Sequence, residues 1–542
     1  MTLTYDAAIV GGGHNGLVAA HYLAAAGLSV VVLERRERVG GLCAPIEFFP
    51  GYRGAITNSP GSLEPKVVRD MQLEKFGLAF DRPDPTVLIP FPDGRAFVGW
   101  RDRERGRAQV EQFSKHDADA YPRLIEHYND FARRLGVSVF APPPSLRQLV
   151  ERLVTPQDEA DFAAVMLGSM RDLLDEHLHS DQVKAVLGML ATAVGNVGPS
   201  TPGSAIGLLP RPLSMASSVV EASHDPRQQP LRGSTGLPRG GMGAVAEAME
   251  ASVRAQGVVV RTGVQVDSFL LGSDNEVRGV VLAGGEEVAA RRVLSNLNPR
   301  TTLLDLLPAG SLPADLEDRL RARTPRGAAF KLVLALDDLP RFTAAPAGEE
   351  EAYASCQFRI GPSLDYLDRG FDDYRYGRWS RSPQLWGLTP SVVDPSLAPP
   401  GRHLMSVNVW YAPYHLQESD WDVEGDRFGK HCIQVLSEYA PNVPDAITDY
   451  RVYTPVDLER EFGLLEGHQL HGDMTLAGMF SWRPVPGLSD YRTPVEGLYL
   501  CGAGTWPGGY VTGIPGHNAS AAVLSDLTDP SRAGDDLMAG LS

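Results

Sequence analysis

Two glycine-rich segments near opposite ends of the chain carry the residue types that hold a dinucleotide phosphate. The first, Gly11-Gly12-Gly13-His14-Asn15-Gly16, follows the apolar run 7–10 and precedes an alanine-rich stretch over 17–26. This order predicts a strand, a tight turn and a helix start, and the backbone N–H groups at such a helix start bind phosphate. Gly11 permits the turn, Gly13 allows the backbone to approach a pyrophosphate, and Gly16 allows the helix to pack closely on the strand.

An acidic residue completes this dinucleotide fingerprint. A second apolar strand over 30–33 ends at Glu34, and a carboxylate about 20 residues after the first glycine accepts a hydrogen bond from a ribose hydroxyl. We therefore expect an adenosine with a free 2′-hydroxyl rather than a 2′-phosphate. The fingerprint by itself is satisfied by FAD and by NAD.

The residues after Glu34 separate these two cofactors. Arg35-Arg36-Glu37-Arg38-Val39-Gly40-Gly41 is a basic turn that ends in a glycine pair. This stretch resembles the FAD-binding amino terminus of the two-dinucleotide-binding-domain flavoproteins, which include amine oxidases and carotenoid desaturases. The resemblance implies that Arg35, Gly41 and Leu42 lie beside FAD, together with His14 and Asn15. Amine oxidases usually have Arg at the position of Leu42, so the chain departs from their pattern there.

The second glycine-rich segment, over 497–520, resembles the second FAD segment of the same flavoproteins. An apolar strand over 498–501 ends in Gly502-Ala503-Gly504, and a helix is predicted to begin near Gly513 and Ile514. The positive end of that helix would stabilise an anionic reduced flavin. The resemblance implies that Trp506, Tyr510 and His517 shape the reaction face, with His517 as a candidate base near neutral pH.

Further short motifs narrow the resemblance. Together with the two FAD segments, Pro238, the stretch 240–242 and Ser295-Asn296 resemble the phytoene desaturase-like superfamily. Within it the likeness is to the bacterial carotene ketolase branch and the related pyridine nucleotide-disulphide oxidoreductase domain 2 proteins, and it covers nearly the whole chain. In this superfamily the position of Val266 holds the adenine through its main chain.

The order of elements predicts an α/β fold. We expect a Rossmann-like FAD-binding domain of the amine oxidase and desaturase type, assembled from residues 1–75, 230–300 and 490–530. A mainly helical insertion over 76–229 is predicted to begin with a strand over 86–91 and to contain helices over 118–135, 146–153, 158–177 and 181–194. A mixed α+β substrate domain is predicted over 301–489, with strands over 328–336 and 403–411 and a helix over 427–439.

Composition excludes several classes of protein. The net charge of −17 argues against a nucleic-acid partner. The four cysteines and 13 histidines show no metal-ligand spacing, so no metal is expected. No window offers the roughly 20 uninterrupted apolar residues of a transmembrane helix, and the first strand begins too close to Met1 for a signal peptide. We expect a cytoplasmic protein, and peripheral contact with a membrane stays open.

These features predict an FAD-dependent oxidoreductase. The first hypothesis is dehydrogenation (desaturation) or oxidation of a large apolar substrate, such as a carotenoid or another polyene, by hydride transfer to flavin N5. The alternatives are oxidation of an alcohol, an amine or a natural-product intermediate, and a non-enzymatic carrier of lipidated proteins. No second nucleotide fingerprint follows a strand, so the electron acceptor is expected to be dioxygen, a quinone or another acceptor. His471 and Asp473 are a candidate polar pair beside the pocket.

Overall fold

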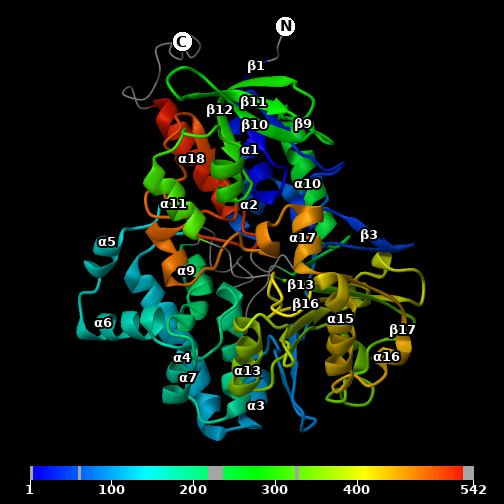
Figure 1. The fold of residues 1–542 in the computed structure, drawn as a ribbon. Helices are drawn as coiled ribbons and strands as arrows, with labels where there is room; N and C mark the ends of the chain where they lie inside the picture. The colour runs from blue at the N-terminus through cyan, green and yellow to red at the C-terminus, as the bar shows by residue number, and fades with distance from the viewer. Residues whose placement is uncertain (1–3, 59–62, 218–235, 324–328, 529–542) are drawn as a thin grey trace.

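The computed structural model describes residues 4–58, 63–217, 236–323 and 329–528 (Figure 1). The predicted α/β architecture is confirmed. A first domain, drawn at the top of Figure 1, contains both ends of the described chain, and a second sheet and a group of helices lie below it. Within the described residues, we find no helix with the length and apolar character that crossing a membrane requires.

The first sheet is the expected nucleotide-binding sheet. Its strand order is β10-β11-β12-β1-β2-β9, and β18 pairs with β12. β1, β2, β9, β12 and β18 run parallel, whereas β10 and β11 form an antiparallel extension. The strands are β1 (Thr4–Val10), β2 (Val30–Leu33), β9 (Val259–Arg261), β10 (Val266–Leu271), β11 (Val277–Leu282), β12 (Glu287–Ser295) and β18 (Leu498–Leu500). All seven lie within the three stretches predicted for the FAD-binding domain.

Three helices cover one side of this sheet. α1 (His14–Ala25) packs between α10 (Met242–Ala255) and α18 (Ile514–Thr528). α1 and α18 begin directly after the two glycine-rich segments. Their N-termini therefore lie beside the carboxyl ends of β1 and β18, where parallel α/β sheets bind ligands.

The second sheet combines residues from both predicted insertions. Its order is β17-β13-β16-β15-β14-β6-β7. The strands are β6 (Val87–Pro90), β7 (Ala96–Val98), β13 (Phe330–Leu336), β14 (Gln357–Ile360), β15 (Leu385–Leu388), β16 (His403–Val409) and β17 (Ile447–Tyr453). The strand predicted over 86–91 thus belongs to the second sheet rather than to a helical unit, because β6 pairs in parallel with β14. The predicted helix over 427–439 is α15 (Trp421–Ser437), which packs on β17.

Most predicted helices of the helical lobe are shorter in the structure, whereas α4 (Lys115–Leu135) is longer than predicted. The others are α3 (Arg103–Glu111), α5 (Leu146–Val150), α6 (Pro156–Phe162), α7 (Met170–His177), α8 (Asp181–Gly188) and α9 (Pro210–Ala216). The single helix predicted over 158–177 is wrong. It divides at Gly168, and Ser169 caps α7 by accepting a hydrogen bond from the Asp172 N–H.

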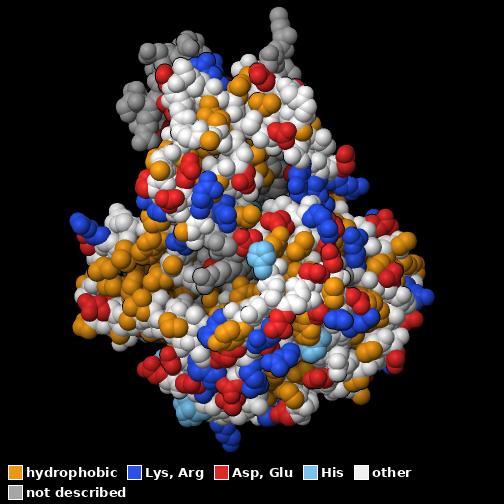
Figure 2. Space-filling model, viewed as in Figure 1, with side chains coloured by type: hydrophobic (Ala, Val, Ile, Leu, Met, Phe, Trp, Pro, Cys, Tyr) orange, Lys and Arg blue, Asp and Glu red, His pale blue; other side chains and the backbone are white. Residues whose placement is uncertain are grey.

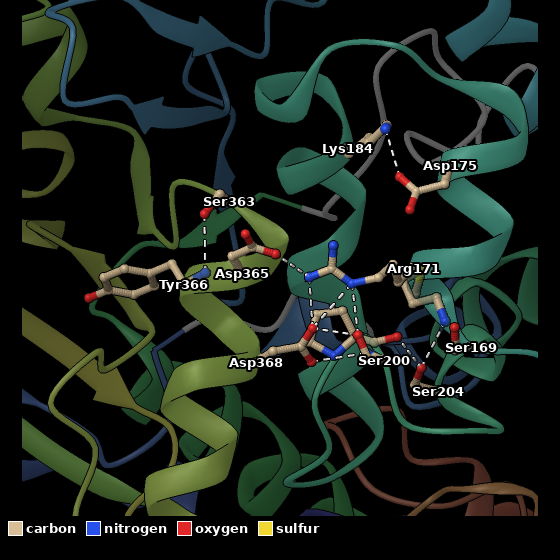
Figure 3. Close-up of polar contacts among 12 residues, drawn as sticks. Ser169, Arg171, Asp175, Lys184, Ser200, Ser204, Ser363, Asp365, Tyr366 and Asp368 are labelled. Atoms are coloured by element: carbon tan, nitrogen blue, oxygen red, sulfur yellow. Dashed lines mark hydrogen bonds and ion pairs between the residues drawn. The ribbon is translucent and has the colours of Figure 1, made fainter.

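A polar cluster joins this lobe to the second-sheet region. Arg171 on α7 donates to Asp365 (2.7 Å) and Asp368 (2.8 Å) on α13 (Leu364–Arg375), and Ser200 donates to Asp368 as well (Figure 3). Planar guanidinium groups suit such forked contacts with carboxylates. The cluster holds α7 against α13 and so fixes the lobe beside the second sheet.

Candidate functional site

A cavity of about 1370 Å³ extends between the two sheets and the helical lobe. Its volume exceeds the range of about 300–1,000 Å³ that is usual for a pocket holding one small molecule. One end is formed by the β1–α1 turn, and the other by α3, α4, α8 and α9. The cavity therefore has room for a dinucleotide and a second molecule.

The β1–α1 turn has the geometry that a pyrophosphate requires. Gly11 has a φ of +95°, which L side chains rarely adopt. A Cβ on Gly16 would overlap the carbonyl oxygen of Gly11, so only glycine lets α1 approach β1 this closely. Gly13 precedes the first residue of α1 and lines the cavity. The first N–H groups of α1 therefore lie at the cavity wall.

Glu34 lies beside this turn. Its carboxylate accepts hydrogen bonds from the N–H of Gly12 (2.8 Å) and of Arg36 (2.9 Å), and the residue lines the cavity. Val266, at the start of β10, lines the same end. The structure thus brings together the residues expected to contact ribose and adenine, although they are more than 200 positions apart in sequence.

Most of the predicted cofactor and catalytic residues line this cavity. They are Gly11, Gly13, His14, Asn15, Glu34, Arg35, Gly41, Leu42, Val266, Ala503, Trp506, Tyr510 and Ile514. The cavity lining does not include Gly16, Gly502, Gly504 or Gly513. A side chain on Gly502 would meet the backbone of Asn296, and one on Gly513 would meet Val18 and Val67. These glycines allow close packing behind the wall rather than contact with a ligand.

The position of His517 corrects the prediction for the reaction face. His517 is outside the cavity lining, one turn along α18, where its ring packs edge-on against Tyr22 and Phe140. Its Nδ1 lies 2.8 Å from Oδ1 of Asn518. Burial lowers its pKa. These contacts indicate that the ring braces α18 against α1.

The predicted pair of His471 and Asp473 is also wrong. Asp473 Oδ1 lies 2.9 Å from Nε2 of His468 instead. His471 has a φ of +55°, which turns the chain, and it lines the cavity.

Several buried nitrogen atoms in the cavity wall have no hydrogen-bond partner among the described residues. They are Nε2 of His14, Nδ1 of His471, and Nε1 of Trp386 and Trp506. Burial lowers the pKa of His14 to about 4 and that of His471 to about 3, so both rings are neutral at pH 7. Unpaired buried polar atoms are costly. A bound molecule with polar atoms at this wall, such as a flavin, would supply their partners.

Arg483 organises the loops around the second glycine-rich segment. The side chain is 2% exposed and donates to backbone carbonyls of Leu470 (2.6 Å), Ala503 (2.6 Å) and Thr505 (3.1 Å), and also to those of 472, 473 and 478. Burial lowers its pKa to about 10. One guanidinium thus holds the wall that carries His471 and Trp506.

A row of polar and aromatic side chains crosses the second sheet, and three of its members, Asn408, Trp386 and Arg359, line the cavity. Lys331, Asn408, Trp386 and Arg359 are register partners on β13, β16, β15 and β14. Buried Lys331 donates to Asn408 (3.0 Å) and to Asn58, and burial lowers its pKa well below 10.5. Sequence reasoning missed Lys331. Its position within the otherwise apolar run 330–336 was the available signal.

Arg36 is a second residue that sequence reasoning did not single out. Its Nη1 donates to the carbonyl of Gly41 (3.2 Å), and its guanidinium lies 4.6 Å from the Phe462 ring centre. Arg36 lines the cavity beside Glu34. It is therefore a further cation at the dinucleotide end, and its signal in the sequence was its place directly after Glu34 and Arg35.

The family can be assigned once this geometry is compared with known proteins. The model of the family described as flavin containing amine oxidoreductase matches residues 16–521. The chain belongs to this family. The glycine turn, Glu34 and the unpaired wall atoms fit FAD as the cofactor of this family. The protein is therefore an FAD-dependent oxidoreductase.

Relatives match along almost the whole chain. Pyridine nucleotide-disulfide oxidoreductase domain-containing protein 2 of Rattus norvegicus is 33% identical, over 96% of this chain and 94% of its own. A limonene dehydrogenase polypeptide of Castellaniella defragrans is 25% identical over 96% and 95%. The lycopene-forming phytoene desaturase of Pantoea ananas is 23% identical over 96% and 98%. The resemblance to the phytoene desaturase-like superfamily is therefore confirmed.

Solved structures share the fold. An oxidoreductase from Methanosarcina mazei has a TM-score of 0.60 at 17% identity, covering 96% of this chain and 100% of the other. A putrescine oxidase bound to putrescine has a TM-score of 0.59 at 17% identity, covering 97% and 99%. At these identities the likeness concerns the fold alone.

Proposed function

We propose that this flavoprotein dehydrogenates a large, uncharged, apolar substrate. The observation that carries the proposal is the lining that the helical lobe and its neighbours give to the cavity, here called the distal end. Aliphatic and aromatic side chains form most of this lining, among them Phe97, Val110, Tyr121, Leu187 and Leu208, and its charged side chains include those of Arg103, Arg107, Asp119, Arg123 and Glu126. Apolar walls of this kind favour a ligand whose surface is itself apolar. Relatives named for limonene and phytoene, both hydrocarbons, support the same class of substrate.

The second-sheet wall disfavours a protonated amine. The Arg359 guanidinium lies 4.2 Å from the ring centre of Trp386 and occupies the aromatic face that would attract an ammonium group. Among the described lining residues, the carboxylates are Glu34, Glu64, Asp119 and Glu126, and none of them belongs to the second sheet. Amine oxidation, which the family name suggests, is the second candidate.

Bound FAD supplies the hydride acceptor, the flavin N5. The chain contributes the geometry of the site. The β1–α1 turn, Glu34 and Val266 would hold the adenosine and pyrophosphate. Trp506 and Tyr510, which line the cavity, would orient the substrate C–H bond and exclude water. The neutral rings of His14 and His471 present hydrogen-bonding groups without adding charge beside an uncharged substrate.

The experiment is anaerobic reduction of the purified protein. Its visible spectrum is recorded with a long polyene, a monoterpene, an alcohol or an amine. Bleaching by the polyene or monoterpene supports the proposal, whereas bleaching by the amine alone replaces it with the second candidate. Leu208→Trp would fill the distal end and should raise KM for the long substrate but not for the short one. Leu208→Met, which conserves volume, is the matched control.

The electron acceptor can be assigned with the same preparation. We propose that dioxygen or a quinone reoxidises the reduced protein, since in the sequence no strand of the first sheet other than β1 leads into a Gly-x-Gly-x-x-Gly turn. Mixing the reduced protein with air-saturated buffer, a quinone or NADP⁺ tests this. Rapid reoxidation by NADP⁺ alone would contradict it.

An exposed apolar patch on the helical lobe is suited to contact with a membrane surface. Leu146 (44% exposed), Val150 (51%), Val154 (83%) and Leu167 (58%) are all exposed. Figure 2 shows hydrophobic side chains gathered over α5 and α6. We propose that this patch contacts the lipid surface from which an apolar substrate is taken. Val150→Asp should then reduce flotation with phosphatidylcholine vesicles, whereas Val423→Asp on α15, where the valine is 50% exposed, should not.

A further inference from the structure

Two histidines that are far apart in sequence meet outside the cavity. His116 lies in the first turn of α4, and His179 lies in the connection between α7 and α8. Their rings are stacked, with centres 3.8 Å apart and planes 8° from parallel. Asp117 lies beside them, and the three residues each offer one ligand atom within 4.8 Å of the other two. None of the three lines the cavity.

The carboxylate of Asp117 fixes this arrangement. It is fully buried and accepts hydrogen bonds from the backbone N–H groups of His179 (2.9 Å) and Ser180 (2.8 Å). It therefore ties the start of α4 to the α7–α8 connection.

The spacing of His116 and Asp117 suits a divalent transition metal. Nδ1 of His116 lies 2.9 Å from Oδ1 of Asp117. Bonds of about 2.0–2.1 Å from one metal ion to two ligands place those ligands roughly 3–3.4 Å apart at octahedral or tetrahedral angles. This contact is close to a ligand spacing. The two stacked rings do not aim their in-plane lone pairs at one point, so one of these exposed imidazoles must rotate to bind the same ion. The His116 side chain is 46% exposed and His179 is exposed, so an ion can reach the site and keep water as its remaining ligands.

We propose that His116, Asp117 and His179 bind a divalent transition metal such as Zn²⁺. Two imidazole nitrogens and a carboxylate oxygen are ligands that Zn²⁺ prefers. The bound ion would join α4 to the α7–α8 connection, and α4 and α8 both form part of the cavity wall. The expected absence of a metal rested on spacing along the sequence, and such spacing cannot show a site whose histidines come from separate elements.

Zinc binding to the tag-free, FAD-loaded protein tests this inference. After treatment with a chelator, the protein is titrated with ZnCl₂ against a chromogenic zinc indicator. We expect one site per chain that is lost or weakened at least tenfold in His116→Ala and in His179→Ala. His415→Ala removes another exposed histidine and should bind zinc as the wild type does. Unchanged flavin spectra show that the variants fold.

A second measurement separates this site from weak binding elsewhere on the surface. Zinc should raise the Tm of the wild type and of His415→Ala, and it should leave the Tm of His179→Ala unchanged, because the crosslink between α4 and the α7–α8 connection is missing. Equal zinc affinity in the wild type and both site variants would overturn the proposal. Absence of any site tighter than the indicator in the wild type would overturn it as well.

Discussion

Replacing Gly13 with Ala tests the assignment of the dinucleotide end most directly. Gly13 has a φ of −69°, which alanine adopts without strain. The added Cβ would lie 2.8 Å from Nδ2 of Asn296 and 3.9 Å from the Gly41 Cα. Asn296 can move aside, at the loss of its 3.2 Å hydrogen bond to the Gly11 carbonyl, which is worth about 1 kcal/mol. The folded protein should therefore survive.

The effect on FAD should be larger. A Cβ at this position projects from the wall where a phosphate is expected to approach the first N–H groups of α1. A hydrogen bond to a charged group is worth about 1.5–3 kcal/mol, and each 1.4 kcal/mol is a factor of ten in Kd. Loss of one such bond predicts a rise of about ten- to one-hundredfold in the Kd for FAD. Titration of the deflavinated protein, followed by flavin fluorescence, measures it.

Two further variants test whether the added Cβ itself causes the loss of FAD affinity. In Gly13→Ala/Asn296→Ala the overlap with Asn296 is relieved, but the hydrogen bond to the Gly11 carbonyl is absent in both variants. The Tm should therefore be no lower than in Gly13→Ala, while FAD affinity stays low. Gly27→Ala makes the same substitution beyond the other end of α1, at a φ of +91° with open space around it. It should lower Tm and leave the Kd unchanged. A Kd for Gly13→Ala within twofold of the wild type would refute the placement of the pyrophosphate.

Three other predictions follow from buried and paired charges. The pKa of Lys331 is lowered in the folded state, so the unfolded chain holds the proton to higher pH. Urea unfolding should therefore show the wild type gaining stability relative to Lys331→Met as pH rises towards about 10.5. The pKa of His471 is lowered to about 3, so the wild type should lose stability relative to His471→Gln as pH falls from 6.5 to about 3, by up to about 1.4 kcal/mol per pH unit. Arg171→Ala should cost about 1–2 kcal/mol in the same assay.

For each of these three predictions, one experimental result would contradict the reasoning. A constant difference between wild type and Lys331→Met across pH would show that the amine is not desolvated. A similar constancy for His471→Gln would show that the ring binds a proton as readily in the folded protein as in the unfolded chain. Arg427, which is 66% exposed, pairs with Glu424 within α15, so Arg427→Ala should cost less than about 0.5 kcal/mol. An equal cost for both arginines would mean that the contact between α7 and α13 adds nothing.

The sequence by itself determined the nucleotide-binding half of the molecule. The turn at 11–16, Glu34 and the segment 497–520 are local patterns, because strand, turn and helix start are set by neighbouring residues. Their placement in the first sheet followed from the parallel order that such patterns require. The α/β class, FAD and the family are confirmed, and the bounds of α1, β2 and the start of α18 agree with the prediction within a few residues.

Tertiary structure alone decided which distant side chains share an environment. Lys331 is one cation within an apolar strand, and only the register across β13, β16, β15 and β14 places it in a row with Arg359. His517 is within the cofactor motif, yet its contacts with Tyr22 and Phe140 hold it away from the cavity. Periodicity in the sequence shows which side of a helix or strand is apolar. It does not show which other element packs against that side, because long-range packing decides that.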